Sequence, residues 1–221
     1  MTIKPASSAI PLWLHRVVTL ALVATPGAVA LTALLIALGA ADPPRAAQRI
    51  WQAADWRWVG GSALALAPGE AGWTTAPVSL PANTRFTLDV RARLLSGSDP
   101  GAAWGVWLAA ADGSRIVYAV SGEGYITTRR CPPGDLPPTL EACPALRPEW
   151  RWTPYPRANP PGATNRLELH REAPGQVRLR LNRERLGLSA VEAAGPWGLW
   201  WRGGRADSAV LTWEAAALYA G

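Results

Sequence analysis

Residues 165–187 read NRLELHREAPGQVRLRLNRERLG. Leucine and valine alternate with charged side chains in this stretch, and a period of two is typical of a strand that buries one face and exposes the other. Residues 181–186, LNRERL, predict a tight hairpin connection within it. The stretch therefore predicts antiparallel strands joined by short turns.

The same alternation recurs along the chain. Phe86–Leu94 has apolar residues at every second position, and the positions between them, Thr87, Asp89, Arg91 and Arg93, form a polar face that we expect to be wet. Further strands are expected at residues 104–110, 115–121, 125–130, 198–202 and 209–215. Short strands at roughly ten-residue spacing, with turn residues between them, predict an all-β sandwich or barrel.

The ordered series of these strands resembles the concanavalin A-like lectin/glucanase jelly roll over residues 56–219. The most telling part is the run NRLELHRE, VRLRLNRERLG and GLW. The resemblance implies an all-β fold in which two antiparallel sheets form a jelly-roll sandwich. One departure is Asn182-Arg183, which stands where the family usually has Asn-Gly, because a positive φ is costly for arginine.

The chain before this domain contains an uncharged run of 25 residues, Val17–Ala41. A membrane-spanning helix needs ~20 apolar residues, so the run predicts a single transmembrane helix. A cleaved signal peptide is the alternative, since Gly39 and Ala41 would suit a cut before Asp42. We favour the anchor because the run is longer than the ~7–15 residues of a signal-peptide core.

The chain is expected to divide into four parts: an N-terminal cytoplasmic tail (1–16), the transmembrane helix (17–41), a linker at the membrane surface (42–55) and an extracytoplasmic β-sandwich domain (56–221). Trp51, Trp56 and Trp58 follow the span. They would lie either at the membrane interface or in the core of the first strand. Basic residues flank the span on both sides, so their number does not fix its orientation.

Cysteine usage favours an orientation. Cys131 and Cys143 are the two cysteines of the chain, and they bracket the proline-rich sequence PPGDLPPTLEA. A stiff, isolated loop of this kind can be closed by a disulfide, which belongs in an oxidising compartment. We therefore expect a Cys131–Cys143 disulfide and a sandwich on the outer side of the cell membrane.

The expected transmembrane helix carries small residues at four-residue spacing, which places them on common faces where another helix can approach closely. These candidate packing residues are Ala24, Ala28, Ala33, Ala37 and Ala41. An alanine-rich composition alone accounts for the pattern equally well.

The sequence offers no convincing catalytic residues. Glycosidases of this fold need two carboxylates ~5–9 Å apart. The nearest acidic sets are Glu168 with Glu172, and Glu184 alone. Glu168 alternates with Arg166 and His170, which is the pattern of a solvated strand face. We therefore expect the chain not to be an enzyme.

Composition also argues against cofactors and nucleic acid. Two His, two Cys and one Met are too few for a multi-ligand metal or haem site. The 22 Lys+Arg against 16 Asp+Glu give a net charge of +6, but the arginines form short pairs on strand faces. A nucleic-acid interface would cluster cations with aromatic residues on one element. No cofactor, metal or nucleic-acid partner is expected.

Tryptophan, present in 13 copies, is the abundant candidate for a contact surface. The candidates within expected strands are Trp104, Trp107, Trp197, Trp200 and Trp201. Trp197 and Trp201 share one face of their strand and Trp200 takes the other, so that strand must be covered on both sides. Core packing, a protein contact and a glycan platform all remain possible for these side chains, in that order of preference.

Two functions are consistent with this sequence. The first is a non-catalytic accessory subunit of a larger membrane complex, for example alternative complex III or a photosynthetic complex in electron transport, with contacts through the helix and the sandwich. The second, implied by the resemblance alone, is a membrane-tethered carbohydrate-binding module that binds glycan at the cell surface.

Overall fold

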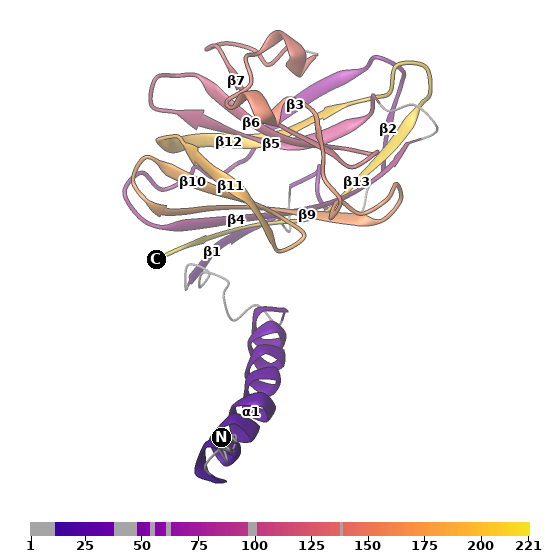
Figure 1. Ribbon diagram of the computed structural model, residues 1–221. Helices are drawn as coiled ribbons and strands as arrows, with labels where there is room; N and C mark the ends of the chain where they lie inside the picture. The colour runs from indigo at the N-terminus through magenta and orange to yellow at the C-terminus, as the bar shows by residue number, and fades with distance from the viewer. Residues whose placement is uncertain (1–11, 38–47, 54–55, 61–62, 97–100, 138) are drawn as a thin grey trace, which may run out of the picture. The chain divides into compact units, whose positions relative to one another are not determined.

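The computed structural model describes residues 12–37, 48–53, 56–60, 63–96, 101–137 and 139–221 (Figure 1). The chain separates into two compact units, which meet in sequence between Pro43 and Pro44. The first unit contains the helix α1 (Leu12–Ala37), and the second contains every described strand.

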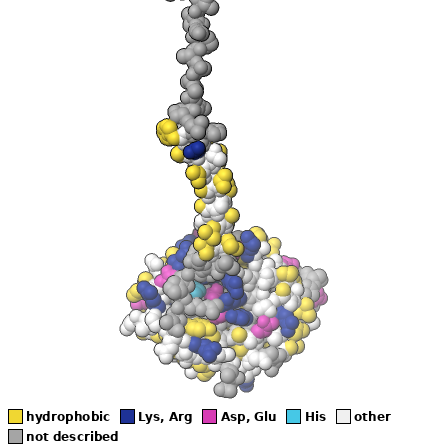
Figure 2. All heavy atoms as spheres, turned by 90° about the horizontal axis from the view of Figure 1, so that it is seen from below, with side chains coloured by type: hydrophobic (Ala, Val, Ile, Leu, Met, Phe, Trp, Pro, Cys, Tyr) yellow, Lys and Arg dark blue, Asp and Glu magenta, His cyan; other side chains and the backbone are white. Residues whose placement is uncertain are grey.

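Helix α1 has the length and composition of a membrane-spanning segment. Arg16–Leu35 is apolar enough to cross a membrane, although a signal sequence would pass the same test. The helix begins at Leu12, five residues before the expected start at Val17, and the expected last residues 38–41 lie outside the described part. Figure 2 shows apolar side chains along the helix and a basic one near one end.

The first sheet, here sheet A, has seven antiparallel strands among the described residues. Its order is β1-β13-β4-β9-β10-β11, and β2 pairs with the other end of β13. The strands are β1 (Gln48–Gln52), β2 (Ala63–Leu66), β4 (Phe86–Ser96), β9 (Thr164–Ala173), β10 (Gln176–Leu181), β11 (Glu184–Ala190) and β13 (Ala209–Ala220).

The second sheet, sheet B, has six described strands in the order β3-β12-β5-β6-β7-β8. They are β3 (Ala71–Thr75), β5 (Ala103–Ala110), β6 (Arg115–Ser121), β7 (Tyr125–Cys131), β8 (Thr153–Pro154) and β12 (Ala193–Arg202). The predicted all-β, two-sheet antiparallel jelly-roll sandwich is therefore confirmed, and β6 has the bounds predicted for residues 115–121.

The main hydrophobic core lies between the sheets. Trp104 of β5 meets Trp213 of β13 edge to face, with ring centroids 5.2 Å apart. Trp51 and Trp56 contact Trp197 in the same way, at 5.6 and 5.7 Å. Of the two alternatives for the tryptophans after the helix, core packing therefore holds for this pair.

The start of the sandwich is earlier than the sequence suggested. Gln48–Gln52, which we assigned to the linker, forms β1 and pairs with the end of β13. Trp51 supplies the reason, because its ring is anchored against the core and holds this short segment on the sheet. Residues 42–47 of the expected linker lie outside the described part.

The outer face of sheet A is not uniformly wet, contrary to our expectation. Asp89 and Glu168, cross-strand neighbours on β4 and β9, are 4% and 3% exposed. Arg166 binds Asp89 through two N–H groups, at 2.9 and 2.7 Å, and its Nη2 lies 2.7 Å from Glu168 Oε1. Mutual neutralisation allows these charges to be buried. Figure 2, which views the sandwich from the side of sheet A, shows both charge signs intermixed.

Candidate functional site

The outer face of sheet B is covered by the chain itself. After β7, the segment Cys131–Trp152, here the covering segment, runs back beside that strand. Its backbone bonds to β7 twice, from Arg130 N to Pro144 O at 3.0 Å and from Leu146 N to Thr128 O at 2.9 Å. The segment contains two short 3-10 helices, η1 (Leu140–Ala142) and η2 (Pro148–Trp150). The covering segment is therefore an irregular stretch of backbone that is hydrogen-bonded to the regular strand β7.

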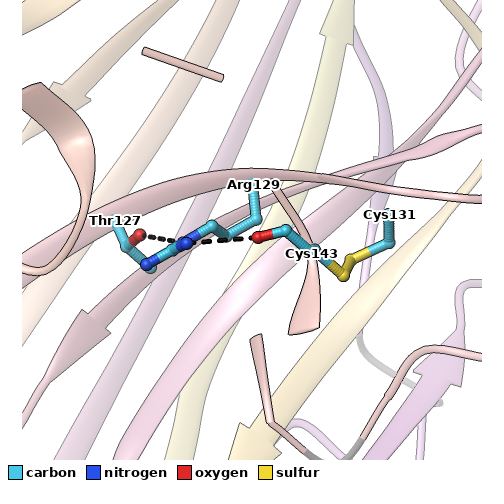
Figure 3. Close-up of a disulfide and its surroundings, with 4 residues drawn as sticks. All are labelled: Thr127, Arg129, Cys131 and Cys143. Atoms are coloured by element: carbon cyan, nitrogen blue, oxygen red, sulfur yellow. Dashed lines mark hydrogen bonds between the residues drawn. A yellow bond between two sulfur atoms is a disulfide. The ribbon is translucent and has the colours of Figure 1, made fainter. Parts of the chain in front are cut away.

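A disulfide closes this segment, as predicted. Cys131 and Cys143 are bonded with an S–S distance of 2.06 Å, and both are at most 1% exposed. Arg129 lies beside them and donates to Thr127 Oγ1 at 2.8 Å and to the Cys143 carbonyl at 3.1 Å (Figure 3). The disulfide and Arg129 together fix the covering segment to β7.

The five tryptophans that we considered as a contact surface are buried, with exposures between 0% and 6%. Those between the sheets are Trp104, Trp197 and Trp201, and those under the covering segment are Trp107 and Trp200. The second cover that the sequence required on β12 is thus the chain's own loop. None of the five offers a surface to a glycan or a partner in this structure.

A different tryptophan reaches the surface at the edge of the covering segment. Trp152 is half-buried, and its indole N–H donates to Glu141 Oε1 at 2.6 Å. Arg202, at the end of β12, donates to the other oxygen of Glu141 at 2.9 Å and to the Gly101 carbonyl at 2.9 Å. The Arg202 guanidinium stands 5.7 Å from the Trp152 ring centroid, within cation–π range. Two side chains, Glu141 and Arg202, thereby hold the Trp152 ring in place.

Trp152 lines a cleft of about 320 Å³. The side chains of this aromatic cleft are Ser121, Glu123, Tyr125, Glu141, Trp152, Arg202 and Arg205, and Gly101 completes its wall. Antiparallel pairing explains why two aromatic residues meet there, because Tyr125 and Ile126 of β7 lie opposite Pro154 and Thr153 of β8. This register brings Trp152 back beside the start of β7.

Of the charged side chains in the aromatic cleft, some are bonded to neighbouring residues and others are not. Burial raises the pKa of Glu141, but its own backbone N–H, Arg202 and the Trp152 N–H together outweigh that effect, so the pKa lies below its usual range. Glu141 is therefore an anion held by donors. Glu123 and Arg205 are different, since neither makes a hydrogen bond or ion pair with a described residue. They are free to meet a ligand.

The acidic residues that we examined for catalysis lie elsewhere. Glu168 is buried in the Arg166 cluster on sheet A, Glu172 pairs with Arg178, and Glu184 pairs with Arg157 at 2.9 Å. His170, expected at the surface, is 3% exposed, and its Nδ1 lies 3.0 Å from Thr87 Oγ1. The structure does not bring these groups together with the aromatic cleft.

The candidate packing alanines of the helix are described in part. Ala24, Ala28 and Ala33 are exposed along α1, the side chain of Ala37 is not described, and Ala41 lies outside the described residues. No group of three His, Cys, Asp or Glu side chains suited to a metal ion occurs in the described ranges.

No sequence pattern pointed to the residues of the aromatic cleft. Glu141 lies in the proline-rich sequence between the two cysteines, Trp152 lies in the stretch after it where no strand was expected, and Arg202 and Arg205 flank a glycine pair after β12. A usable signal was present, because loops carried by a rigid scaffold often bear binding residues. Trp152, which follows the disulfide-bonded Cys143 in the same irregular stretch, was the feature to follow.

The fold is a two-sheet antiparallel jelly-roll sandwich, and several solved structures are similar to it. The carbohydrate-binding module CBM66 from Bacillus subtilis has a TM-score of 0.46 and 12% identity, covering 72% of this chain and 96% of its own. The potassium-bound Emp46p carbohydrate recognition domain has a TM-score of 0.44 and 10% identity, covering 72% and 86%. Galectin LEC-6 from Caenorhabditis elegans has a TM-score of 0.38 and 13% identity, covering 67% and 94%.

These likenesses are too distant to carry an argument about a ligand or a site. No protein-family model matches the sequence, and no curated protein matches it. A functional assignment must therefore come from the geometry of the aromatic cleft.

Proposed function

We propose that this chain is a membrane-tethered carbohydrate-binding protein that holds a saccharide in the aromatic cleft. The observation that carries the proposal is the Trp152 ring, half-buried and fixed by Glu141 and Arg202 in a cleft that also contains Tyr125. A ring held in this way loses little conformational freedom when a ligand binds, which favours affinity.

The chemistry of the cleft suits a sugar. A pyranose or furanose ring presents an apolar C–H face and a rim of hydroxyl groups. Trp152 and Tyr125, which is 37% exposed, offer apolar faces with a polar end. Glu123 and Arg205 offer an acceptor and donors for hydroxyls. The volume of about 320 Å³ lies at the lower end of the ~300–1,000 Å³ typical of ligand sites and fits one or two sugar residues.

The proposed role is binding without catalysis. A general acid needs a proton near neutral pH, whereas the donors around Glu141 lower its pKa and keep it ionised. Its carboxylate is also committed to Trp152 and Arg202, which suits a positioning group. Helix α1 would then hold the binding domain at a membrane, with the sandwich on the outer side.

The proposal is tested by glycan binding to the full chain in lipid nanodiscs, first on a glycan array and then by calorimetry. Trp152→Ala should weaken binding about tenfold or more, since a stacked aromatic contact and its buried area are lost. Trp152→Phe keeps a ring but loses the N–H to Glu141, so its affinity should be intermediate. Tyr219→Ala on sheet A serves as the aromatic control. The proposal would be refuted if the wild-type chain bound none of the glycans, or if Trp152→Ala bound with the same affinity as wild type.

A further inference from the structure

A second hollow shares Glu141 of η1 with the aromatic cleft. It has a volume of about 420 Å³ and is lined by Arg129, Glu141, Cys143, Pro144, Ala145 and Arg151. We call it the arginine hollow. Glu141 lines both the hollow and the aromatic cleft, and Arg151 directly precedes Trp152 in sequence, so the two sites are neighbours that share one residue.

Arg129 is a buried cation whose hydrogen-bond partners are neutral groups. It is 6% exposed, and its hydrogen bonds go to the Thr127 hydroxyl and the Cys143 carbonyl (Figure 3). Among the described residues, no carboxylate forms an ion pair with it. Burying a charge without a directly bonded counter-ion is costly, and Glu141 acts on Arg129 only through its charge and not through an ion pair. The position therefore points to an anion that is bound from outside.

Arg151 adds a second cation at the same hollow. It is exposed and makes no hydrogen bond or ion pair with a described residue. Burial lowers the pKa of Arg129, the Glu141 charge raises it, and the Arg151 charge lowers it, which places all three groups within electrostatic reach of each other. Both guanidinium groups stay charged near neutral pH because arginine does not deprotonate in proteins.

The charge of Glu141 acts on Arg129, but the hydrogen bonds of its oxygens go to Trp152 and Arg202, and among the described residues it forms no ion pair with Arg129 or Arg151. Across the cleft and the hollow, four arginines face two glutamates. The arginines are Arg129, Arg151, Arg202 and Arg205, and the glutamates are Glu123 and Glu141. The combined surface therefore carries an excess of two positive charges beside an aromatic ring.

We propose that the ligand is an acidic oligosaccharide, with one sugar residue stacked on Trp152 and the anionic group of a neighbouring residue lodged at Arg129 and Arg151. This inference rests on the proposed function and specifies its ligand class. A carboxylate or a sulfate ester would both fit, because guanidinium groups bind either oxyanion through paired N–H donors.

The test measures binding by the full chain in zwitterionic nanodiscs, with three matched probes: an oligogalacturonate, the neutral galactan oligomer of the same length, and a sulfated galactan oligomer. Wild type should bind at least one anionic probe about tenfold more tightly than the neutral one, with affinity falling as salt rises. Which anionic probe is preferred separates a uronate from a sulfate ligand.

Arg151→Ala should remove most of that tenfold preference and leave binding of the neutral probe unchanged. Arg151→Glu should reverse the preference. Arg93→Ala, an exposed arginine on sheet A, is the matched control and should change neither. Because Arg151 is exposed, these variants should fold.

The outcomes separate this inference from the proposed function. Equal affinity for neutral and anionic probes, with binding lost in Trp152→Ala, would overturn the acidic ligand and leave carbohydrate binding intact. A preference for anions that persists in Arg151→Ala and Arg151→Glu would also overturn the inference. Absence of binding to all three probes and to every glycan of an array would remove the proposed function itself.

Discussion

At the scale of single residues, the aromatic cleft depends on Glu141, which joins two otherwise separate side chains. Its oxygens accept hydrogen bonds from the Trp152 indole and the Arg202 guanidinium, and Arg202 also donates to the Gly101 carbonyl. Side chains that are locked by neighbouring hydrogen bonds give a more precise site than free ones. Removing the charge of Glu141 should therefore loosen the ring without unfolding the domain.

We predict that Glu141→Gln weakens saccharide binding about tenfold, since a charge-assisted hydrogen bond contributes ~1.5 kcal/mol or more. The pKa of Glu141 is lowered in the folded protein, so its interactions persist above the usual carboxyl range and are lost only as the pH falls through the lowered value. Wild-type affinity should be constant from neutral pH to about pH 5 and decline in stronger acid. Calorimetric titration with saccharide over this pH range checks both expectations. A Glu141→Gln variant with the affinity of wild type would contradict the prediction.

A second residue-scale feature is the hairpin between β10 and β11. Asn182 and Arg183 both have positive φ, 51° and 75°. Side-chain hydrogen bonds stabilise this conformation of Asn182. Its Oδ1 accepts from the Arg166 amide at 2.9 Å, and its Nδ2 donates to the Arg157 carbonyl at 2.7 Å. Arg183 makes no comparable side-chain contact, so its left-handed backbone is strained. The departure from Asn-Gly seen in the sequence is thus present in the structure as a two-residue turn.

We predict that Arg183→Gly raises the free energy of unfolding by ~0.5–1 kcal/mol. Relief of the left-handed strain, ~1–2 kcal/mol, is partly offset by the extra entropy of glycine in the unfolded chain. Thermal unfolding followed by tryptophan fluorescence provides the measurement. Arg183→Ala keeps the strain and should show no such gain. A lower midpoint for the glycine variant would show that the turn is not strained.

At the scale of elements, the covering segment combines three tasks. It buries Trp107 and Trp200 on the outer face of sheet B, carries Glu141 and Trp152 to the cleft, and is closed by the Cys131–Cys143 disulfide. Its irregular, proline-rich backbone has few regular hydrogen bonds of its own. The covalent closure should therefore matter both for stability and for binding.

We predict that Cys131→Ser combined with Cys143→Ser lowers the free energy of unfolding by up to ~3 kcal/mol, with the proline content reducing the effect. Saccharide affinity should fall as well, because Glu141 and Trp152 lose their support. A reductant should reproduce both effects in wild type and have none on the double variant. Full binding by the reduced protein would show that β7 pairing alone holds the segment.

Elements were more predictable than the site. Period-two alternation located β4, β9 and β10 because apolar and polar residues alternate along each of them. The short strand β1 escaped notice because its place in the sheet depends on Trp51 contacting residues far away in sequence. The aromatic cleft depends in the same way on β8 pairing with β7, which no local pattern encodes.

At the scale of the whole molecule, the question is what the apolar helix would do besides tethering the domain in the proposed binding protein. Helix α1 is long enough to span a membrane, and the described side chains along it are exposed, including Ala24, Ala28 and Ala33. Such a surface is compatible with lipid, and also with a second membrane helix that approaches over the small residues. A membrane-tethered binding protein needs only contact between the helix and lipid, whereas an accessory subunit of a complex needs contact with a second membrane helix.

The two possibilities respond differently to Ala24→Leu combined with Ala28→Leu. Leucine keeps insertion favourable and blocks close approach of another helix. For a simple tether, we predict that the double variant stays in the membrane fraction, binds saccharide as wild type does, and migrates at the same size in mild detergent. Val23→Arg serves as the opposing control, because a central arginine costs ~2.5–3.5 kcal/mol on insertion and should lower the membrane-bound fraction. A double variant that remains in the membrane and binds saccharide, yet migrates at a smaller size than wild type, would mean that the helix packs against another chain. The protein would then be both a saccharide-binding domain and a subunit of a larger assembly.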